Sequence, residues 1–273
     1  MPELPEVETV RSGLALLLAD RPILCRVQLM RADLRAPIPA SLARRLRGQP
    51  IIAVRRRAKY LLFETPAATL LCHLGMTGTW RLAPSGDERI HDHCYLHFFD
   101  GRRLAYRDPR RFGLLDLIEP GRAEEHPALA GLGPEPLDAR AFTGAVLAER
   151  CAGRKVAIKP LIMDQRVVVG VGNIYAAEAL FRAGIRPSCF SGRVSRPRLD
   201  ALVAAIRAVL LEAIAAGGST ISDFRQAGGD SGYFQTRFQV YDRAGQPCVR
   251  CGAKLRGAVL GGRSTVWCSR CQR

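Results

Sequence analysis

The pattern of hydrophobic positions divides the chain into a short helical start, a long β-rich stretch and a helical second half. Apolar residues at helical spacing predict an amphipathic helix from residue 3 to about residue 19. Short β-branched, aromatic and alternating runs then predict antiparallel strands within residues 23–30, 51–63, 69–82 and 94–116. We therefore expect a β-sandwich or a flattened barrel in the first half of the chain.

Turn-forming residues mark the limits of these regions. Asp100-Gly101, between two strand-like runs, suits the positive backbone angles of a tight hairpin turn. The Gly- and Pro-rich residues 131–136 precede a change to helical periodicity, with helices expected at about 139–151, 157–163, 173–183 and 197–216. We place domains at 1–131, 132–236 and 237–273. The glycine-rich residues 227–232 predict a functional loop.

The charge of the chain indicates a polyanionic partner. Lys and Arg outnumber Asp and Glu by 41 to 25, which gives a formal net charge of +16 and a pI near 10.2. A solvated basic surface without a partner would repel itself, so nucleic acid is the favoured interpretation. No apolar run of about 18 residues predicts a membrane span, and the first residues do not form a signal peptide. We expect a cytoplasmic protein that does not bind membranes.

Four of the nine cysteines predict a structural zinc site. They form two CxxC pairs separated by sixteen residues, a spacing that closes a tetrahedral shell around zinc: Cys248, Cys251, Cys268 and Cys271. A redox role is less favoured because both pairs lie in short polar segments outside any βαβ pattern. The other cysteines lie in apolar stretches where a buried thiol is the usual outcome, so disulfides are not expected.

The segment around these cysteines is basic. From Arg243 to Arg273 it contains seven Lys or Arg residues and no acid, so it is suited to contact phosphates. Arg263 falls where the tip of a hairpin is expected. A second candidate metal cluster, His91, His93 and His97, is better interpreted as polar strand residues because no further ligands accompany it.

The N-terminus carries a candidate nucleophile. Removal of the initiator methionine would give Pro2 a free secondary amine, whose pKa lies near 7.7 to 8.0 for an ordinary N-terminus. Such an amine is partly unprotonated near neutral pH and can form an iminium with a sugar carbon. Pro2 followed by Glu3 is also typical of a plain helix N-terminus, so this motif is weak in isolation.

Several motifs together give the chain a close resemblance to the bacterial formamidopyrimidine-DNA glycosylases, which repair 8-oxoguanine. They are residues 2–10 (PELPEVETV), Lys59-Tyr60-Leu61-Leu62, His73-Leu74-Gly75-Met76-Thr77-Gly78, Asp108-Pro109-Arg110-Arg111-Phe112-Gly113, Gly170-Val171-Gly172-Asn173-Ile174-Tyr175, Gly262-Arg263-Ser264 and the four-cysteine finger. The resemblance implies an α+β fold. An N-terminal β-sandwich capped by the first helix would precede a helix-two-turns-helix domain with a lesion-covering loop at about 217–235, and then the zinc finger.

The resemblance also implies a role for individual residues. Pro2 would attack C1′ of the damaged nucleotide, Glu3 would carry protons, and Lys59 would add a charge near the reacting phosphates. The strand would then be cut by β- and δ-elimination. The space left by the extruded nucleotide would be filled by Met76, Arg110 and Phe112. DNA would be held by His93, Arg110, Asn173 and Arg263, the last also donating the proton for δ-elimination.

Two other functions fit part of the sequence. The sister glycosylase for oxidised pyrimidines, endonuclease eight, shares Pro2 and Glu3 but differs in the residues that follow them. A zinc-finger nucleic-acid-binding protein without catalysis fits the charge and the cysteines but leaves Pro2, Glu3 and Lys59 unexplained. The resemblance implies a monomer, in the bacterial cytoplasm at the nucleoid, that acts on damaged double-stranded DNA and holds one structural Zn²⁺.

Overall fold

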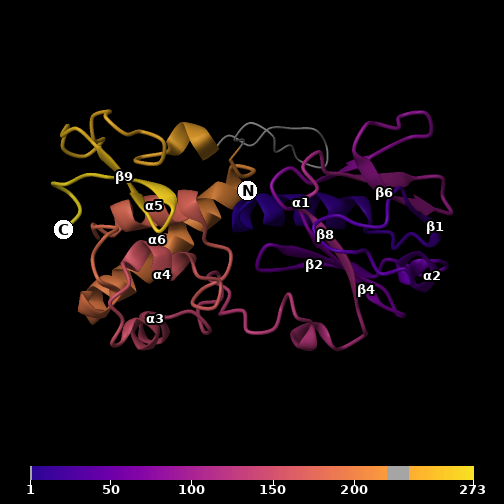
Figure 1. Cartoon of the computed structure of the whole chain (residues 1–273), viewed down its shortest axis with the longest axis horizontal. Helices are drawn as coiled ribbons and strands as arrows, with labels where there is room; N and C mark the ends of the chain where they lie inside the picture. The colour runs from indigo at the N-terminus through magenta and orange to yellow at the C-terminus, as the bar shows by residue number, and fades with distance from the viewer. Residues whose placement is uncertain (1, 220–233) are drawn as a thin grey trace. The chain divides into compact units, whose positions relative to one another are not determined.

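The computed structural model describes residues 2–219 and 234–273 (Figure 1). The chain divides into two compact units. The first contains Met1–Ala130 and the segment that starts at Gly217, and the second contains Gly131–Ala216 and Phe234–Arg273. Most of the predicted lesion-covering loop at about 217–235 lies outside the described residues.

The first unit consists of one long helix and two four-stranded antiparallel sheets. Helix α1 spans Leu4–Leu17. The first sheet has the order β1-β6-β7-β5, with β1 at Leu24–Leu29, β6 at Asp92–Phe98, β7 at Arg103–Arg107 and β5 at Thr79–Leu82. The second has the order β2-β3-β4-β8, with β2 at Ala53–Arg57, β3 at Tyr60–Glu64, β4 at Thr69–His73 and β8 at Leu114–Ile118.

One large apolar core is shared by α1 and both sheets. Helix α1 contributes Val7, Val10 and Leu14, while the sheets contribute large side chains such as Phe63 and Trp80, all at most 1% exposed. Burial of each such side chain stabilises the fold by about 1.5–3 kcal/mol. Two sheets that share one core form a sandwich, as the alternating strand pattern predicts.

Local detail agrees with the sequence at the Asp100-Gly101 turn and differs from it elsewhere. Gly101 has a φ of 86°, and the backbone N–H of Phe98 donates to the Arg102 carbonyl at 2.9 Å. Helix α2 (Leu42–Leu46) was not expected, because five residues are too few to show a helical period. A short 3-10 turn, η1 (Ala123–Glu125), follows the last strand of the sandwich.

The second unit is helical and ends in a two-stranded hairpin. Helix α6 packs against α3 and α5, and α5 also packs against β10. The buried face of α6 is the apolar stripe that the sequence shows. The elements are α3 (Gly144–Cys151), α4 (Ile158–Met163), α5 (Asn173–Arg182), η2 (Ser191–Arg193), α6 (Arg196–Ala215), η3 (Phe234–Arg237), β9 (Arg256–Leu260) and β10 (Arg263–Trp267).

The predicted start of the first helix in this unit, at about residue 139, is wrong. Helix α3 begins at Gly144 because Thr143 caps it, its side-chain oxygen accepting from the backbone N–H of Val146 at 3.3 Å. The preceding residues form a turn instead, held by the Asp138 carboxylate, which accepts from the backbone N–H of Arg140 at 2.8 Å.

Across the described residues, no helix is both long and apolar enough to cross a membrane.

Candidate functional site

The N-terminal Pro2-Glu3 pair is buried at the start of α1. Glu3 is 3% exposed, and its backbone N–H donates to Glu6 Oε2 at 2.8 Å. The other oxygen of Glu6 accepts from the backbone N–H and the hydroxyl of Ser219, both at 2.9 Å. One buried carboxylate therefore fixes the backbone beside Pro2 and connects it to Ser219.

Lys59 lies in the turn between β2 and β3 and is 6% exposed. The preceding residue, Ala58, has a φ of 54°, an uncommon angle for a residue other than glycine. The same hairpin is joined to α1, because Arg56 Nε lies 2.7 Å from Glu8 Oε2. The structure thus places Lys59 on a hairpin that is anchored to the helix carrying Glu3.

His73 was not singled out from the sequence, although it lies within one of the motifs. Its Nδ1 accepts from the backbone N–H of Gly75 at 2.9 Å, and its ring packs edge-on against Tyr60 at 4.9 Å between centroids. Burial, together with the positive charges of Arg35 and Lys59, lowers the pKa of His73 to about 3. The imidazole is therefore neutral, with Nδ1 as acceptor and Nε2–H as donor. The sequence feature that could have identified it is its position as the one histidine in the apolar run of β4.

The three predicted gap-filling residues lie on two neighbouring turns of the first unit. Met76 is 38% exposed and Phe112 is 45% exposed, so two large apolar side chains face outward. The guanidinium carbon of Arg110 lies 4.7 Å from the centre of the Phe112 ring, a cation–π distance. An added Cβ at Gly75 would lie 2.4 Å from the backbone of Phe112, so the two turns are in direct contact.

His93 faces the second of these turns. Its Nε2 lies 2.9 Å from the backbone oxygen of Asp108, and burial lowers the pKa of its ring. His97 instead contacts the side chain of Gln28 at 3.2 Å, while the ring centres of His91 and His93 lie 6.4 Å apart. The three histidines therefore do not converge on one point.

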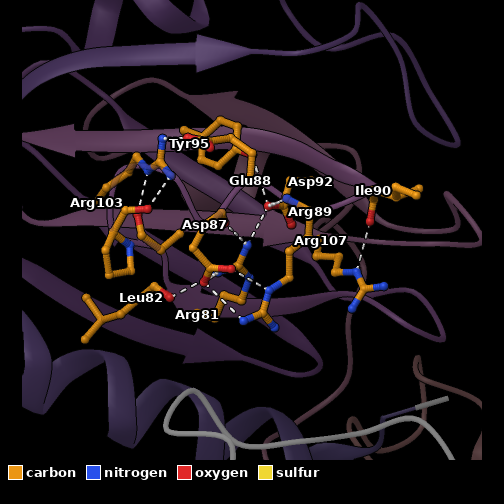
Figure 2. A network of polar contacts seen from close by, with 12 residues as sticks. Arg81, Leu82, Asp87, Glu88, Arg89, Ile90, Asp92, Tyr95, Arg103 and Arg107 are labelled. Carbon is orange, nitrogen blue, oxygen red and sulfur yellow. Dashed lines mark hydrogen bonds and ion pairs between the residues drawn. The ribbon is translucent and has the colours of Figure 1, made fainter.

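A network of arginines holds the segment that leads into His93 (Figure 2). Arg81 bridges the carboxylates of Asp87 and Asp92, each at 2.6 Å. Arg103 pairs with Glu88 at 2.5 Å and stacks on the ring of Tyr95. These contacts fix residues 83–92 on the outer face of strands β5, β6 and β7.

In the second unit, a buried lysine connects Asn173 to the strand that begins at Arg263. Asn173 is the first residue of α5, and Arg263 begins β10 directly after the Gly261-Gly262 turn. Buried Lys159 of α4 donates to Asn173 Oδ1 at 2.7 Å, to the Ser264 carbonyl at 2.9 Å and to Thr265 Oγ1 at 2.7 Å. The sequence did not single out Lys159, because a lysine in an apolar helix is ordinarily exposed.

A second buried charge, Glu178, holds the approach to the finger. It is fully buried on α5 and accepts from the backbone N–H groups of Gln239, Val240 and Tyr241 at 2.8–3.1 Å. Lys159 and Glu178 thus attach both the hairpin and the residues before it to the helices of this unit. Neither role is visible in the periodicity of the sequence.

The four cysteines of the finger form a cluster that fits zinc. Their sulfur atoms all lie within 4.8 Å of one another, with Cys248 and Cys271 separated by 3.9 Å and Cys251 and Cys268 by 3.5 Å. A tetrahedral site with Zn–S bonds of about 2.3 Å needs sulfur–sulfur distances of about 3.8 Å. All four positions of the shell would be filled by sulfur, so the ion is structural.

Three family models match the chain in succession. They are the formamidopyrimidine-DNA glycosylase N-terminal domain at residues 1–115, the H2TH domain of the same glycosylases at 132–225, and a zinc finger found in FPG and IleRS at 245–273. A sandwich, an H2TH region and a four-cysteine finger define a DNA glycosylase that binds DNA and holds one structural zinc ion.

Full-length relatives agree with these matches. The formamidopyrimidine-DNA glycosylase of Bdellovibrio bacteriovorus is 59% identical, and that of Syntrophotalea carbinolica is 52% identical, with all of both chains covered in each case. The chain belongs to the formamidopyrimidine-DNA glycosylase family and is a DNA-repair enzyme that acts on oxidised bases.

Solved structures show the same fold. The MutM (FPG) protein of Thermus thermophilus matches with a TM-score of 0.88 and 41% identity, covering 99% of this chain and 98% of that one. A Lactococcus lactis FPG mutant in complex with DNA containing Fapy-dG matches with a TM-score of 0.90 and 33% identity over the whole of both chains. The predicted fold class is confirmed.

Proposed function

We propose that this enzyme excises oxidised purines, namely 8-oxoguanine and formamidopyrimidines, from duplex DNA and then cuts the strand. The observation that carries the proposal is the buried Pro2-Glu3 pair, whose backbone is fixed by Glu6. A fixed terminal amine can be held at the position of attack, which lowers the entropic part of the barrier. The complex of the Lactococcus lactis protein with Fapy-dG DNA supports the choice of substrate.

The proposed chemistry begins after removal of the initiator methionine. The Pro2 nitrogen attacks C1′ and forms a bond to it, while the bond to the damaged base breaks and the base leaves with a proton. The sugar ring then opens to a Schiff base, with Glu3 carrying protons, and Lys59 offsets the charge of the nearby phosphates. Loss of the 3′ phosphate and then the 5′ phosphate completes β- and δ-elimination, with Arg263 as the proton donor of the second step.

The remaining predicted residues act on the DNA. A nucleotide must leave the stack before an amine can reach C1′, so Met76, Arg110 and Phe112 occupy the space that it leaves. Asn173 and Arg263 hold the DNA backbone in the second unit, and His93 does so in the first. We keep the division at 1–131, 132–236 and 237–273, with a monomer working in the bacterial cytoplasm at the nucleoid.

Borohydride trapping tests the reaction and its substrate together. The mature enzyme would be incubated with duplexes containing 8-oxoguanine, a formamidopyrimidine or an oxidised pyrimidine, and the covalent complex would be quantified. We expect trapping on both purine lesions. Preferential trapping on the pyrimidine would instead support the sister activity, which one Lactococcus lactis FPG complex with oxidised-pyrimidine DNA makes worth including. No trapping on any duplex would support a binding protein without catalysis.

An N-terminal extension separates the nucleophile from binding. One extra residue before Pro2 converts its amine into an amide, which cannot form an iminium, and leaves the finger and the basic surface unchanged. We expect the extended protein to bind damaged duplex but to lose base excision and trapping. Excision at the normal rate by a protein whose extension is verified by mass spectrometry would rule out Pro2 as the nucleophile.

A further inference from the structure

The residues proposed to fill the gap in DNA come from two separate turns of the first unit. Met76 lies in the turn between β4 and β5, whereas Arg110 and Phe112 lie in the turn between β7 and β8. These side chains can act on one gap only if the two turns keep a fixed spacing. All three side chains face outward, so they are not held in place by packing against the core. Other contacts must fix the spacing of the two turns.

A side-chain hydrogen bond joins the two turns directly. Thr77, next to Met76, donates from Oγ1 to Oδ1 of Asp108 at 2.6 Å. The same hydroxyl accepts from the backbone N–H of Arg110 at 3.3 Å. One threonine hydroxyl therefore contacts both the first residue of the second turn and the backbone of a residue proposed to enter DNA.

Asp108 also closes its own turn. It is fully buried, its Oδ2 accepts from the backbone N–H of Gly113 at 2.8 Å, and its carbonyl accepts from the backbone N–H of Arg111 at 3.2 Å. Thr77 thus bonds to the carboxylate that determines the shape of residues 108–113. Loss of a partner would leave a buried carboxylate oxygen with one fewer donor, which is costly.

The backbone around this contact has little room to adjust. Gly75 and Phe112 are in backbone contact, and a Cβ at Gly113 would lie 1.9 Å from the hydroxyl oxygen of Tyr106. Arg111 has a φ of 57°, which a non-glycine residue adopts only when its surroundings hold it there. The geometry of the second turn is therefore imposed by its contacts.

We infer that Thr77 and Asp108 form a clasp that holds Met76, Arg110 and Phe112 in one register, so that Thr77 is a positioning residue for nucleotide extrusion. This inference rests on the proposed function, because it assigns Thr77 a role in that reaction. Thr77 does not contact the reacting atoms in this scheme. It acts by keeping two turns at the spacing that a duplex gap requires.

The test compares Thr77→Val, which keeps the shape of the side chain but removes the hydroxyl, with Thr77→Ser, which keeps the hydroxyl. The matched control is Thr65→Val. Thr65 lies in the turn between β3 and β4, and its buried hydroxyl donates to the Ala68 carbonyl at 2.6 Å and accepts from the Ala68 N–H at 3.1 Å. The control likewise removes one donated and one accepted hydrogen bond, but both lie within a single turn of the same unit.

Two single-turnover rates are measured for each protein: excision of 8-oxoguanine from a duplex, and cleavage at an abasic site in a single strand. Cleavage of the second substrate uses the same nucleophile, but a single strand has no gap in a stacked duplex for the three side chains to fill. We expect Thr77→Val to slow the first rate by about ten- to a hundredfold and to leave the second within about twofold, since small displacements of positioned groups have effects of this size. Thr77→Ser should restore the duplex rate.

A double variant checks that Thr77 acts through the gap-filling residues. In a Phe112→Ala background, Thr77→Val should cost less than in the wild type, because one of the three residues that it positions is already absent. Should Thr77→Val fail to fold in a thermal melt, Thr77→Ala replaces it, because it also removes the hydroxyl and leaves the contacts of Asp108 within its own turn intact. Equal losses on both substrates, or a loss matched by Thr65→Val, would overturn the clasp.

The wild type separates this inference from the proposed function. If the wild type neither excises 8-oxoguanine nor traps with borohydride, the proposed function fails. If the wild type does both and Thr77→Val keeps the wild-type duplex rate, only the clasp fails.

Discussion

In the first unit, the candidate catalytic residues lie at the start of α1 and in the turn between β2 and β3, around one large apolar core. In the second unit, the candidate DNA contacts depend on buried charges and a metal. The core of the sandwich draws on α1 and both sheets. The core of the finger contains few buried apolar side chains, and two of them are zinc-binding cysteines. A segment as short as residues 237–273 cannot bury enough apolar surface to fold without such help.

Because the two units are stabilised differently, we expect them to respond differently to mutation. An apolar core distributes its free energy over many contacts, so a single polar change near a turn should alter function more than folding. In the second unit, several contacts depend on a single atom: the Lys159 nitrogen donates to three acceptors, and one zinc ion would bind four sulfurs. Loss of either atom should therefore detach the zinc-finger hairpin from its surroundings.

The zinc site should give the largest effect. Cys248→Ser should lose stoichiometric zinc and the ordered finger, because structural zinc contributes about 10–16 kcal/mol to the folding of isolated fingers. We expect affinity for duplex DNA to fall sharply while the thermal transition of the sandwich remains. Zinc content by mass spectrometry and DNA binding by fluorescence anisotropy measure both.

Cys189→Ser is the matched control, since Cys189 is a free cysteine of the same unit outside the zinc cluster. It should keep both zinc and affinity. Full zinc occupancy with normal DNA affinity in Cys248→Ser would contradict the structural role of the site.

Lys159 should give the next largest effect. Lys159→Met keeps the length of the side chain but leaves Asn173 Oδ1, the Ser264 carbonyl and Thr265 Oγ1 without this donor. We expect a loss of about 3 kcal/mol in unfolding free energy, given the cost of leaving buried acceptors unsatisfied. The affinity of the Lys159→Met variant for duplex DNA should also fall. Exposed Lys155→Met removes one charge from the same region and should change the stability by less than about 0.5 kcal/mol.

Arg110 tests the first unit at the level of function. Arg110→Ala should slow excision from a duplex by about a hundredfold and cleavage at a duplex abasic site far less, because an abasic nucleotide is easier to displace. The unfolding free energy should hardly change, since the side chain is exposed. Arg44→Ala removes an exposed arginine of α2 and should leave both rates intact. Equal losses on the two substrates would remove Arg110 from gap filling.

The sequence predicted the parts of each unit that depend on local pattern. Alternating residues and the Asp100-Gly101 turn predicted the hairpin of β6 and β7, and the spacing of the cysteines predicted the finger. Strand order could not be predicted, because β1 pairs with β6 through contacts about 70 residues apart in sequence. Buried Lys159, Glu178 and His73 were missed for a related reason: their burial is produced by segments remote in sequence, and local pattern treats a charged or polar residue as exposed.

His73 carries the smallest predicted effect, which is visible only as a dependence of stability on pH. In the folded protein, burial and the charges of Arg35 and Lys59 lower the pKa of His73 to about 3, whereas the unfolded chain titrates near 6.5. Between these two values the unfolded state binds a proton that the folded state does not. The contribution of His73 to stability is therefore complete only well above pH 6.5. It decreases as the pH falls through this value, with a slope that approaches about 1.4 kcal/mol for each pH unit once the unfolded histidine is fully protonated.

His73→Asn isolates this contribution, because its side-chain oxygen can still accept from the backbone N–H of Gly75 but does not titrate. We expect the unfolding free energy of the wild type to fall relative to that of the variant by about 1 kcal/mol between pH 6.5 and pH 5.5, whatever fixed cost the substitution adds at neutral pH. The fixed cost shifts both ends of the variant curve equally, so only the slope is diagnostic. Parallel curves would mean that another group causes the acid sensitivity of the sandwich and that the imidazole of His73 is protonated in the folded protein near its ordinary pKa.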